Sequence, residues 1–128
     1  NFTGEYNSSL ISSREEVLAA SIGRDRIIVD ARSSDRFNGK VAEPRSGLQL
    51  GHIPNSLNIP FETLLFENKI RPKEELAKIF SEIDNKNTPL IFSCGSGVTA
   101  CIDAMAATVL GYQAISIYDG SWSEWGQT

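Results

Sequence analysis

Four short runs of strand-forming residues occur along this chain, and segments of helical length separate them. The runs cover residues 26–30, 56–59, 89–93 and 114–118. The first is continuously apolar until Asp30, which is typical of a strand buried on both faces of a sheet. Because strands alternate with helices, the sequence predicts an α/β fold in which a parallel sheet carries helices on both faces.

The first expected helix covers residues 13–21. Ser13 with Glu16, or Ser12 with Glu15, has the spacing of a capping box. Its apolar side is expected to consist of Val17, Leu18 and Ile22.

Two further helices are bounded by proline and glycine. Pro72 is suited to the first position of a helix that runs to about residue 83. A helix over 98–110 is expected to end at Gly111, because glycine suits the left-handed residue that follows a helix. Residues 33–51 show no sustained period, which predicts a long loop with one helical turn near 34–37.

Composition indicates one compact domain over residues 1–128. The chain has 41% hydrophobic residues, and at this length folding buries somewhat under ~70% of the unfolded surface, enough for a core without disulfides. The longest nearly apolar stretch, 98–110, is shorter than the ~20 residues that cross a bilayer, so no membrane association is expected. The chain begins at Asn1 without a signal-peptide pattern, which predicts a processed protein or a piece of a longer one.

The charge distribution favours a small anionic ligand. The formal net charge is −4, which argues against nucleic-acid binding, yet five of the seven arginines lie between Arg24 and Arg45. A solvated arginine-rich loop explains this cluster equally well. The two cysteines and the single His52 lack metal-ligand spacing, so neither a metal nor a cofactor is expected. The low cysteine content predicts a reducing compartment, the cytoplasm or else the mitochondrion.

Cys94 is the strongest candidate for a catalytic residue. It leaves the carboxyl end of an expected buried strand and begins a glycine-containing loop that leads directly into a helix, where α/β sheets place their ligand sites. Converging backbone N–H groups and the helix N-terminus favour the thiolate, the nucleophilic form of cysteine. The alternative is a buried structural cysteine beside a packing turn.

The residues from Ser93 to Thr99 resemble the active-site loop of the rhodanese-like sulfurtransferases, in the branch that uses 3-mercaptopyruvate. The similarity extends in order from about Ile27 to Gly126. The other matching stretches are 29–32, 36–39, 43–45, 51–60 and 118–125.

This resemblance implies a five-stranded parallel sheet and a covalent mechanism. Cys94 attacks the donor sulfur, becomes a persulfide, and passes the outer sulfur to cyanide or to a thiol such as thioredoxin. Arg36 and Arg45 take the positions of the substrate-binding arginines, and Ser96 that of the loop serine that helps to protonate the leaving pyruvate enolate. The remaining loop residues expected to bind substrate are Gly95, Gly97, Val98 and Thr99.

In the family, the histidine and aspartate that join the loop serine come from a second, N-terminal rhodanese-like domain. The segment before Ile27 is too short to be that domain, and His52 belongs to a structural turn in the family. We therefore expect this chain to be the catalytic C-terminal half of a two-domain enzyme. A natural single-domain protein is the alternative.

Three competing functions are less favoured. Thiosulfate sulfurtransferases have basic residues just after the cysteine, where this loop has Gly95 and Ser96. Dual-specificity phosphatases of the same fold need an arginine six positions after the cysteine, where this chain has Ala100. Non-catalytic rhodanese modules commonly lack the cysteine that is present here.

Several other side chains are expected to be structural. Asp30 and Arg32 are predicted to form an ion pair at a strand end. Cys101 is expected to be buried as a small hydrophobic residue, and Asp103 to face solvent or cap a neighbour. The aromatic residues expected in the core or at a domain interface are Trp122 and Trp125, and the alternative is that the segment from Tyr118 to Trp125 borders the pocket.

Overall fold

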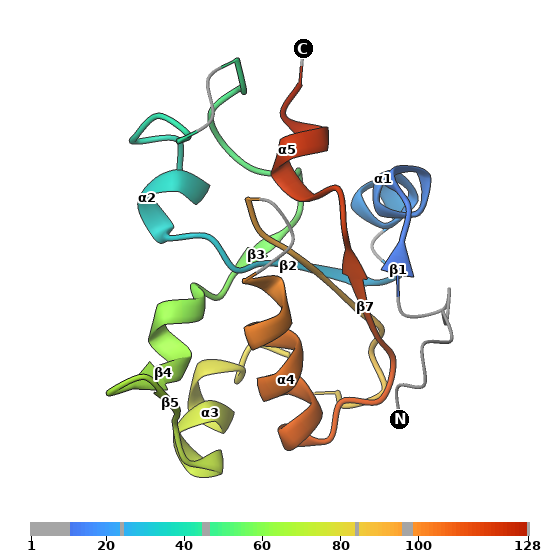
Figure 1. The fold of residues 1–128 in the computed structure, drawn as a ribbon. Coiled ribbons are helices and arrows are strands. Elements are labelled where there is room, and N and C mark those ends of the chain that lie inside the picture. The colour runs from blue at the N-terminus through green and yellow to red at the C-terminus, as the bar shows by residue number, and fades with distance from the viewer. Residues whose placement is uncertain (1–10, 24, 45–46, 84, 96–98, 128) are drawn as a thin grey trace, which may run out of the picture.

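A computed structural model describes residues 11–23, 25–44, 47–83, 85–95 and 99–127 of the chain. Its centre is a five-stranded parallel sheet in the order β1-β7-β6-β2-β3 (Figure 1). The strands are β1 (Ile11–Ser12), β2 (Ile27–Asp30), β3 (Leu57–Asn58), β6 (Leu90–Ser93) and β7 (Ile115–Tyr118). The predicted parallel α/β fold with five strands is therefore confirmed.

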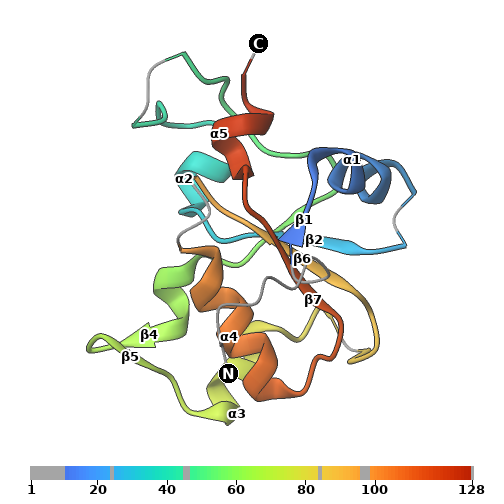
Figure 2. The ribbon, with the colours of Figure 1, turned by 45° about the vertical axis from the view of Figure 1, so that its right-hand side comes forward.

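Helices cover both faces of the sheet, α1 and α5 on one side and α3 and α4 on the other (Figures 1 and 2). The helices are α1 (Arg14–Gly23), α2 (Ser34–Phe37), the 3-10 helix η2 (Phe61–Leu64), α3 (Lys73–Ile79), α4 (Ala100–Leu110) and α5 (Ser121–Trp125). Leu90, Phe92 and Cys94 contribute to the core beneath α3 and α4, whereas Ile91 contributes to the core beneath α1 and α5. This alternation follows from the period of two along β6.

The capping box of α1 is the Ser13 and Glu16 pair. The Ser13 N–H donates to Glu16 Oε1 at 2.8 Å, and the Glu16 N–H donates to Ser13 Oγ at 3.2 Å. The expected apolar side was wrong in part, because Leu18 is 43% and Ile22 74% exposed. The buried side of the helix consists of Val17, Ala20 and Ser21, which are spaced three and four residues apart. Ser21 can be buried there because its hydroxyl donates to the Pro54 carbonyl.

The helix predicted over 72–83 is shorter in the structure. It ends at Ile79, after which the Ser81 and Ile83 N–H groups donate to carbonyls three residues earlier. Ile83 is nevertheless buried, so the apolar spacing identified the buried side but not the end of the helix. The two-stranded hairpin β4 (Leu65–Phe66) and β5 (Lys69–Ile70) and the two-residue β1 were not predicted, because runs this short show no period.

α4 presents a buried face of small residues to the sheet and corrects two expectations. Cys101 is exposed rather than buried, and Asp103 is fully buried rather than facing solvent. Asp103 lies three residues after Ala100 and three before Ala106, which places it in the middle of the buried face. Gly111 ends the helix with a φ of 97°, as predicted. Among the described residues, the helices are all too short or too polar to cross a membrane.

Candidate functional site

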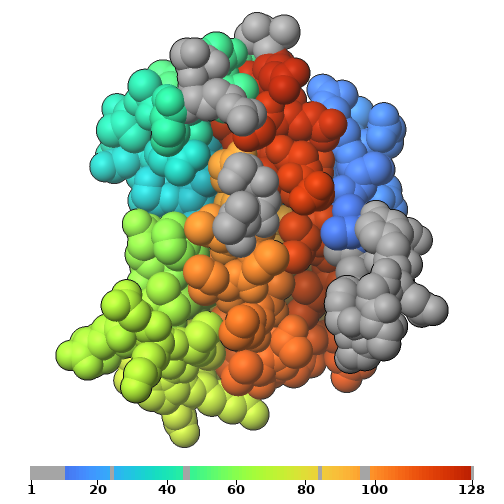
Figure 3. Space-filling model, in the orientation of Figure 1, coloured from blue at the N-terminus to red at the C-terminus, as the bar shows by residue number. Residues whose placement is uncertain are grey.

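The candidate site lies at the carboxyl end of the sheet, where β2 and β6 end side by side. Asp30 pairs with Ser93 in the sheet register, so the residues after these strands emerge next to each other. Figure 3 shows the α2 region (cyan), α5 (red) and α4 (orange) on the same face of the molecule. The parallel connectivity thus brings the arginine-rich loop to the Cys94 loop.

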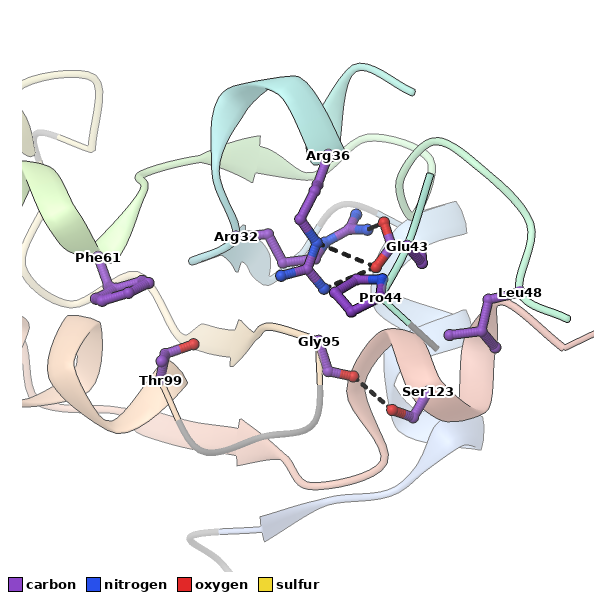
Figure 4. A pocket seen from close by; sticks show the side chains of 9 residues that line it. All are labelled: Arg32, Arg36, Glu43, Pro44, Leu48, Phe61, Gly95, Thr99 and Ser123. Atoms are coloured by element: carbon purple, nitrogen blue, oxygen red, sulfur yellow. Dashed lines mark hydrogen bonds and ion pairs between the residues drawn. The ribbon is translucent and has the colours of Figure 1, made fainter. Parts of the chain in front are cut away.

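A pocket of about 390 Å³ opens between these elements (Figure 4). Cys94 is 1% exposed and lies directly before Gly95, which lines the pocket. The lining residues are Arg32, Arg36, Glu43, Pro44, Leu48, Phe61, Gly95, Thr99 and Ser123. The described lining therefore combines two guanidinium groups and one carboxylate with an apolar wall.

Glu43 joins the two arginines of the pocket. Its buried carboxylate accepts from Arg32 Nη1 at 2.9 Å and from Arg36 Nη2 and Nε at 2.7 and 3.2 Å. Arg32 also pairs with Asp30 at 2.8 Å, which confirms the predicted ion pair, and its guanidinium lies 4.6 Å from the Trp122 ring centre. Arg36 is thereby fixed in plane and position while its side chain remains 27% exposed to the pocket.

Arg36 lies directly against the backbone of Gly95, the residue that follows Cys94. A Cβ atom added to Gly95 would be 2.5 Å from Arg36 Nη2, closer than carbon and nitrogen atoms approach without a bond. Glycine at position 95 therefore leaves the space that the guanidinium occupies beside the residue that follows Cys94.

The first turn of α5 holds the backbone of Cys94. Ser121 Oγ accepts from the Cys94 N–H at 3.0 Å and donates to the Tyr118 carbonyl at 2.8 Å. The Trp122 N–H donates to the Cys94 carbonyl at 2.9 Å. Ser121 has a φ of 52°, in the left-handed region that serine rarely adopts, so the fold tolerates local strain where α5 meets Cys94.

Asp103 lies close to Cys94, and within the described part of the chain neither of its carboxyl oxygens has a hydrogen-bond partner. Burial, together with the nearby charges of Asp30 and Cys94, raises the pKa of Asp103 from 3.8 to about 9. The carboxyl group is therefore neutral at pH 7 and adds no negative charge near the nucleophile.

His52 has a structural role, as expected. Its ring stacks on Phe37 with 3.8 Å between ring centres, and Nδ1 is 2.7 Å from the Phe37 carbonyl oxygen. Across the described parts of the chain, His, Cys, Asp and Glu side chains do not gather in threes as a metal site requires.

The structure brings together four of the eight predicted site residues, namely Cys94, Gly95, Thr99 and Arg36. The other four, Ser96, Gly97, Val98 and Arg45, lie outside the described residues. Sequence reasoning assigned no role to Glu43 or Ser123. For Glu43, the available signal was a glutamate within an arginine-rich loop. For Ser123, the available signal was the alternative that the segment from Tyr118 to Trp125 borders the pocket.

Comparison with known proteins agrees with this geometry. The family model of the rhodanese-like domain matches residues 13–128. The chain is 41% identical over 126 residues to the 3-mercaptopyruvate sulfurtransferase of Escherichia coli K12, covering 98% of this chain and 45% of that protein. It is 50% identical over 99 residues to the mitochondrial thiosulfate/3-mercaptopyruvate sulfurtransferase 1 of Arabidopsis thaliana, covering 76% of this chain and 26% of that protein.

Solved structures show the same fold. The crystal structure of the Escherichia coli 3-mercaptopyruvate sulfotransferase superposes with a TM-score of 0.79 at 38% identity, covering 97% of this chain and 46% of that one. The chain thus spans less than half the length of the relatives it matches. On the family match, the sequence identity and the shared fold, the chain belongs to the rhodanese-like family and is homologous to the 3-mercaptopyruvate sulfurtransferases.

Proposed function

We propose that this chain transfers the sulfur of 3-mercaptopyruvate to a thiol or cyanide through a persulfide on Cys94, releasing pyruvate. The observation that carries the proposal is the position of Arg36, which Glu43 holds against the backbone of Gly95. A guanidinium fixed in this way suits a small carboxylate donor whose sulfur must reach the adjacent cysteine.

The first half of the reaction needs no external oxidant. The Cys94 thiolate attacks the sulfur of 3-mercaptopyruvate, an S–S bond forms, and the C–S bond breaks with its electron pair on carbon. The resulting pyruvate enolate takes up a proton and leaves as pyruvate. The cysteine sulfur and the transferred sulfur are each oxidised by one electron in this step, and the donor carbon is reduced by two.

In the second half, an acceptor thiolate or cyanide attacks the outer sulfur of the persulfide. The S–S bond breaks, and Cys94 returns as a thiolate while the acceptor carries the sulfur. We also propose that a second rhodanese-like domain supplies the histidine and aspartate that act with Ser96. The length of the matched relatives supports this, because this chain covers only 45% of the Escherichia coli protein.

Thiosulfate is the competing donor, and the names of the Arabidopsis relatives include it. A dianionic donor favours positive charge directly after the cysteine. The close contact between Gly95 and Arg36 leaves no room for a basic side chain there. The geometry therefore supports the carboxylate donor.

Intact-protein mass spectrometry after brief incubation with each donor tests the proposal. The wild type is expected to gain one sulfur atom, faster from 3-mercaptopyruvate, and a reducing thiol should remove it. Cys94→Ala should gain none, whereas Cys101→Ala, which removes the exposed thiol, should load like the wild type. Loading of Cys94→Ala, or failure of both donors on the wild type, would contradict the proposal.

A further inference from the structure

Ser123 makes two hydrogen bonds to the residue that follows the nucleophile. Its hydroxyl donates to the Gly95 carbonyl at 2.7 Å (Figure 4). Its N–H donates to the same oxygen at 2.9 Å. The backbone bond alone satisfies the carbonyl, so the fold does not require the hydroxyl there. Two donors on one oxygen do restrict the direction in which that carbonyl points.

Such restriction matters most at a glycine, whose backbone is the freest of any residue. On one side, the Gly95 carbonyl is bound by Ser123. On the other side, the Arg36 guanidinium occupies the space where a side chain would stand. A rotation of the peptide that carries this carbonyl would change the path of the chain as it leaves Gly95, next to the guanidinium.

The same turn of α5 also contacts the arginine network. The Trp122 N–H binds the Cys94 carbonyl, and the Trp122 ring lies under the guanidinium of Arg32, which Glu43 connects to Arg36. The Trp122 indole Nε1 donates to the Gln49 carbonyl at 2.8 Å, which fixes the ring. Residues 121–123 are therefore in contact with both the nucleophile and the groups that hold the guanidinium.

We propose that Ser123 is a positioning residue for persulfide formation, because its hydroxyl fixes the direction of the Gly95 carbonyl and with it the loop backbone that leaves Cys94 beside Arg36. This inference rests on the proposed function. Glu43 holds Arg36 independently of Ser123, so donor affinity should survive the loss of the hydroxyl. The maximal rate of sulfur transfer should fall instead.

The test measures sulfur loading of Cys94 against 3-mercaptopyruvate concentration in Ser123→Ala and Ser123→Thr. Cys101→Ser serves as the common background, so that Cys94 is the one thiol. The matched control is Ser56→Ala, because the Ser56 hydroxyl also donates to a backbone carbonyl at 2.7 Å but lies outside the pocket lining. Alkylation of Cys94 by iodoacetamide is measured in parallel, since it needs no sulfur donor.

Ser123→Ala should lower the maximal loading rate roughly three- to tenfold, the effect of one ordinary hydrogen bond, with the half-saturating donor concentration within about twofold of wild type. Ser123→Thr should restore the rate, and Ser56→Ala should leave it unchanged. The buried Cys94 should be alkylated faster in Ser123→Ala because its loop is less fixed.

If Ser123→Ala loads sulfur and is alkylated as fast as the wild type, the inference is overturned. A fall in loading rate that Ser123→Thr does not restore would overturn it as well. If the wild type takes up no sulfur, the proposed function fails. The alkylation rates then still decide the positioning role: unchanged rates in Ser123→Ala contradict it, and faster alkylation supports it.

Discussion

Asp103 is held in the buried face of α4, where the described residues give neither of its oxygens a hydrogen bond, and this makes the stability of the fold depend on pH. Its pKa is about 9 in the folded chain and near 3.8 when unfolded. Between these pH values the folded state therefore binds more protons than the unfolded state. The free energy of unfolding is highest below pH 4 and falls progressively as pH rises toward 9.

Asp103→Asn should remove this dependence. Between pH 5.5 and 8, we expect the wild-type free energy of unfolding to fall by about 1 kcal/mol per pH unit from Asp103 alone, and Asp103→Asn to lack that part of the slope. Urea unfolding at several pH values measures it. Asp35→Asn is the control, because Asp35 is exposed and should keep the wild-type slope. Equal slopes in wild type and Asp103→Asn would contradict the neutral buried acid.

Gly95 determines whether the guanidinium can lie beside the nucleophile. Gly95→Ala places a methyl group 2.5 Å from Arg36 Nη2, so the arginine side chain must move. We expect kcat/KM for 3-mercaptopyruvate to fall by about tenfold, with little change in stability because the flexible end of a side chain gives way. Gly23→Ala is the control, since its added Cβ would meet Asp25 at an ordinary 3.6 Å. Unchanged kcat/KM in Gly95→Ala would show that this contact is dispensable.

Among the secondary-structure elements, the connection between the end of β2 and helix α2 depends on Glu43. Its side chain is 1% exposed and pairs with both Arg32 and Arg36, so its loss leaves Arg32 buried with fewer partners. Glu43→Gln should destabilise the chain by about 3 kcal/mol in urea unfolding. Glu75→Gln, which breaks the exposed pair with Arg71, should cost under about 1 kcal/mol. Similar costs for the two variants would argue against the buried network.

For the molecule as a whole, the sequence predicted the elements whose signals are local. The sheet strands of four residues, the single turn α2 and the end of α4 at Gly111 carry their own patterns. The orientation of α4 could not be predicted, because Cys101, Met105 and Val109 make its exposed side as apolar as its buried side. An apolar pattern on all sides of a helix does not indicate which face is buried, and so Cys101 and Asp103 were misplaced.

The site was predicted only in part, because the signals in the sequence are local. Cys94 was identified from the strand and loop around it, which are adjacent in sequence. The contacts from Glu43 to Arg36 and from Ser123 to Gly95 join segments that only the folded sheet brings together. No local pattern specifies such pairs.

In the proposed mechanism, Cys94 takes sulfur from a carboxylate donor held beside it. The most direct test is a rapid-quench measurement of pyruvate released from 3-mercaptopyruvate in the absence of any acceptor. We predict a burst of one pyruvate per wild-type chain that stops when Cys94 is loaded, and no burst from Cys94→Ala. Absence of the burst in the wild type, or its persistence in Cys94→Ala, would contradict a persulfide on Cys94.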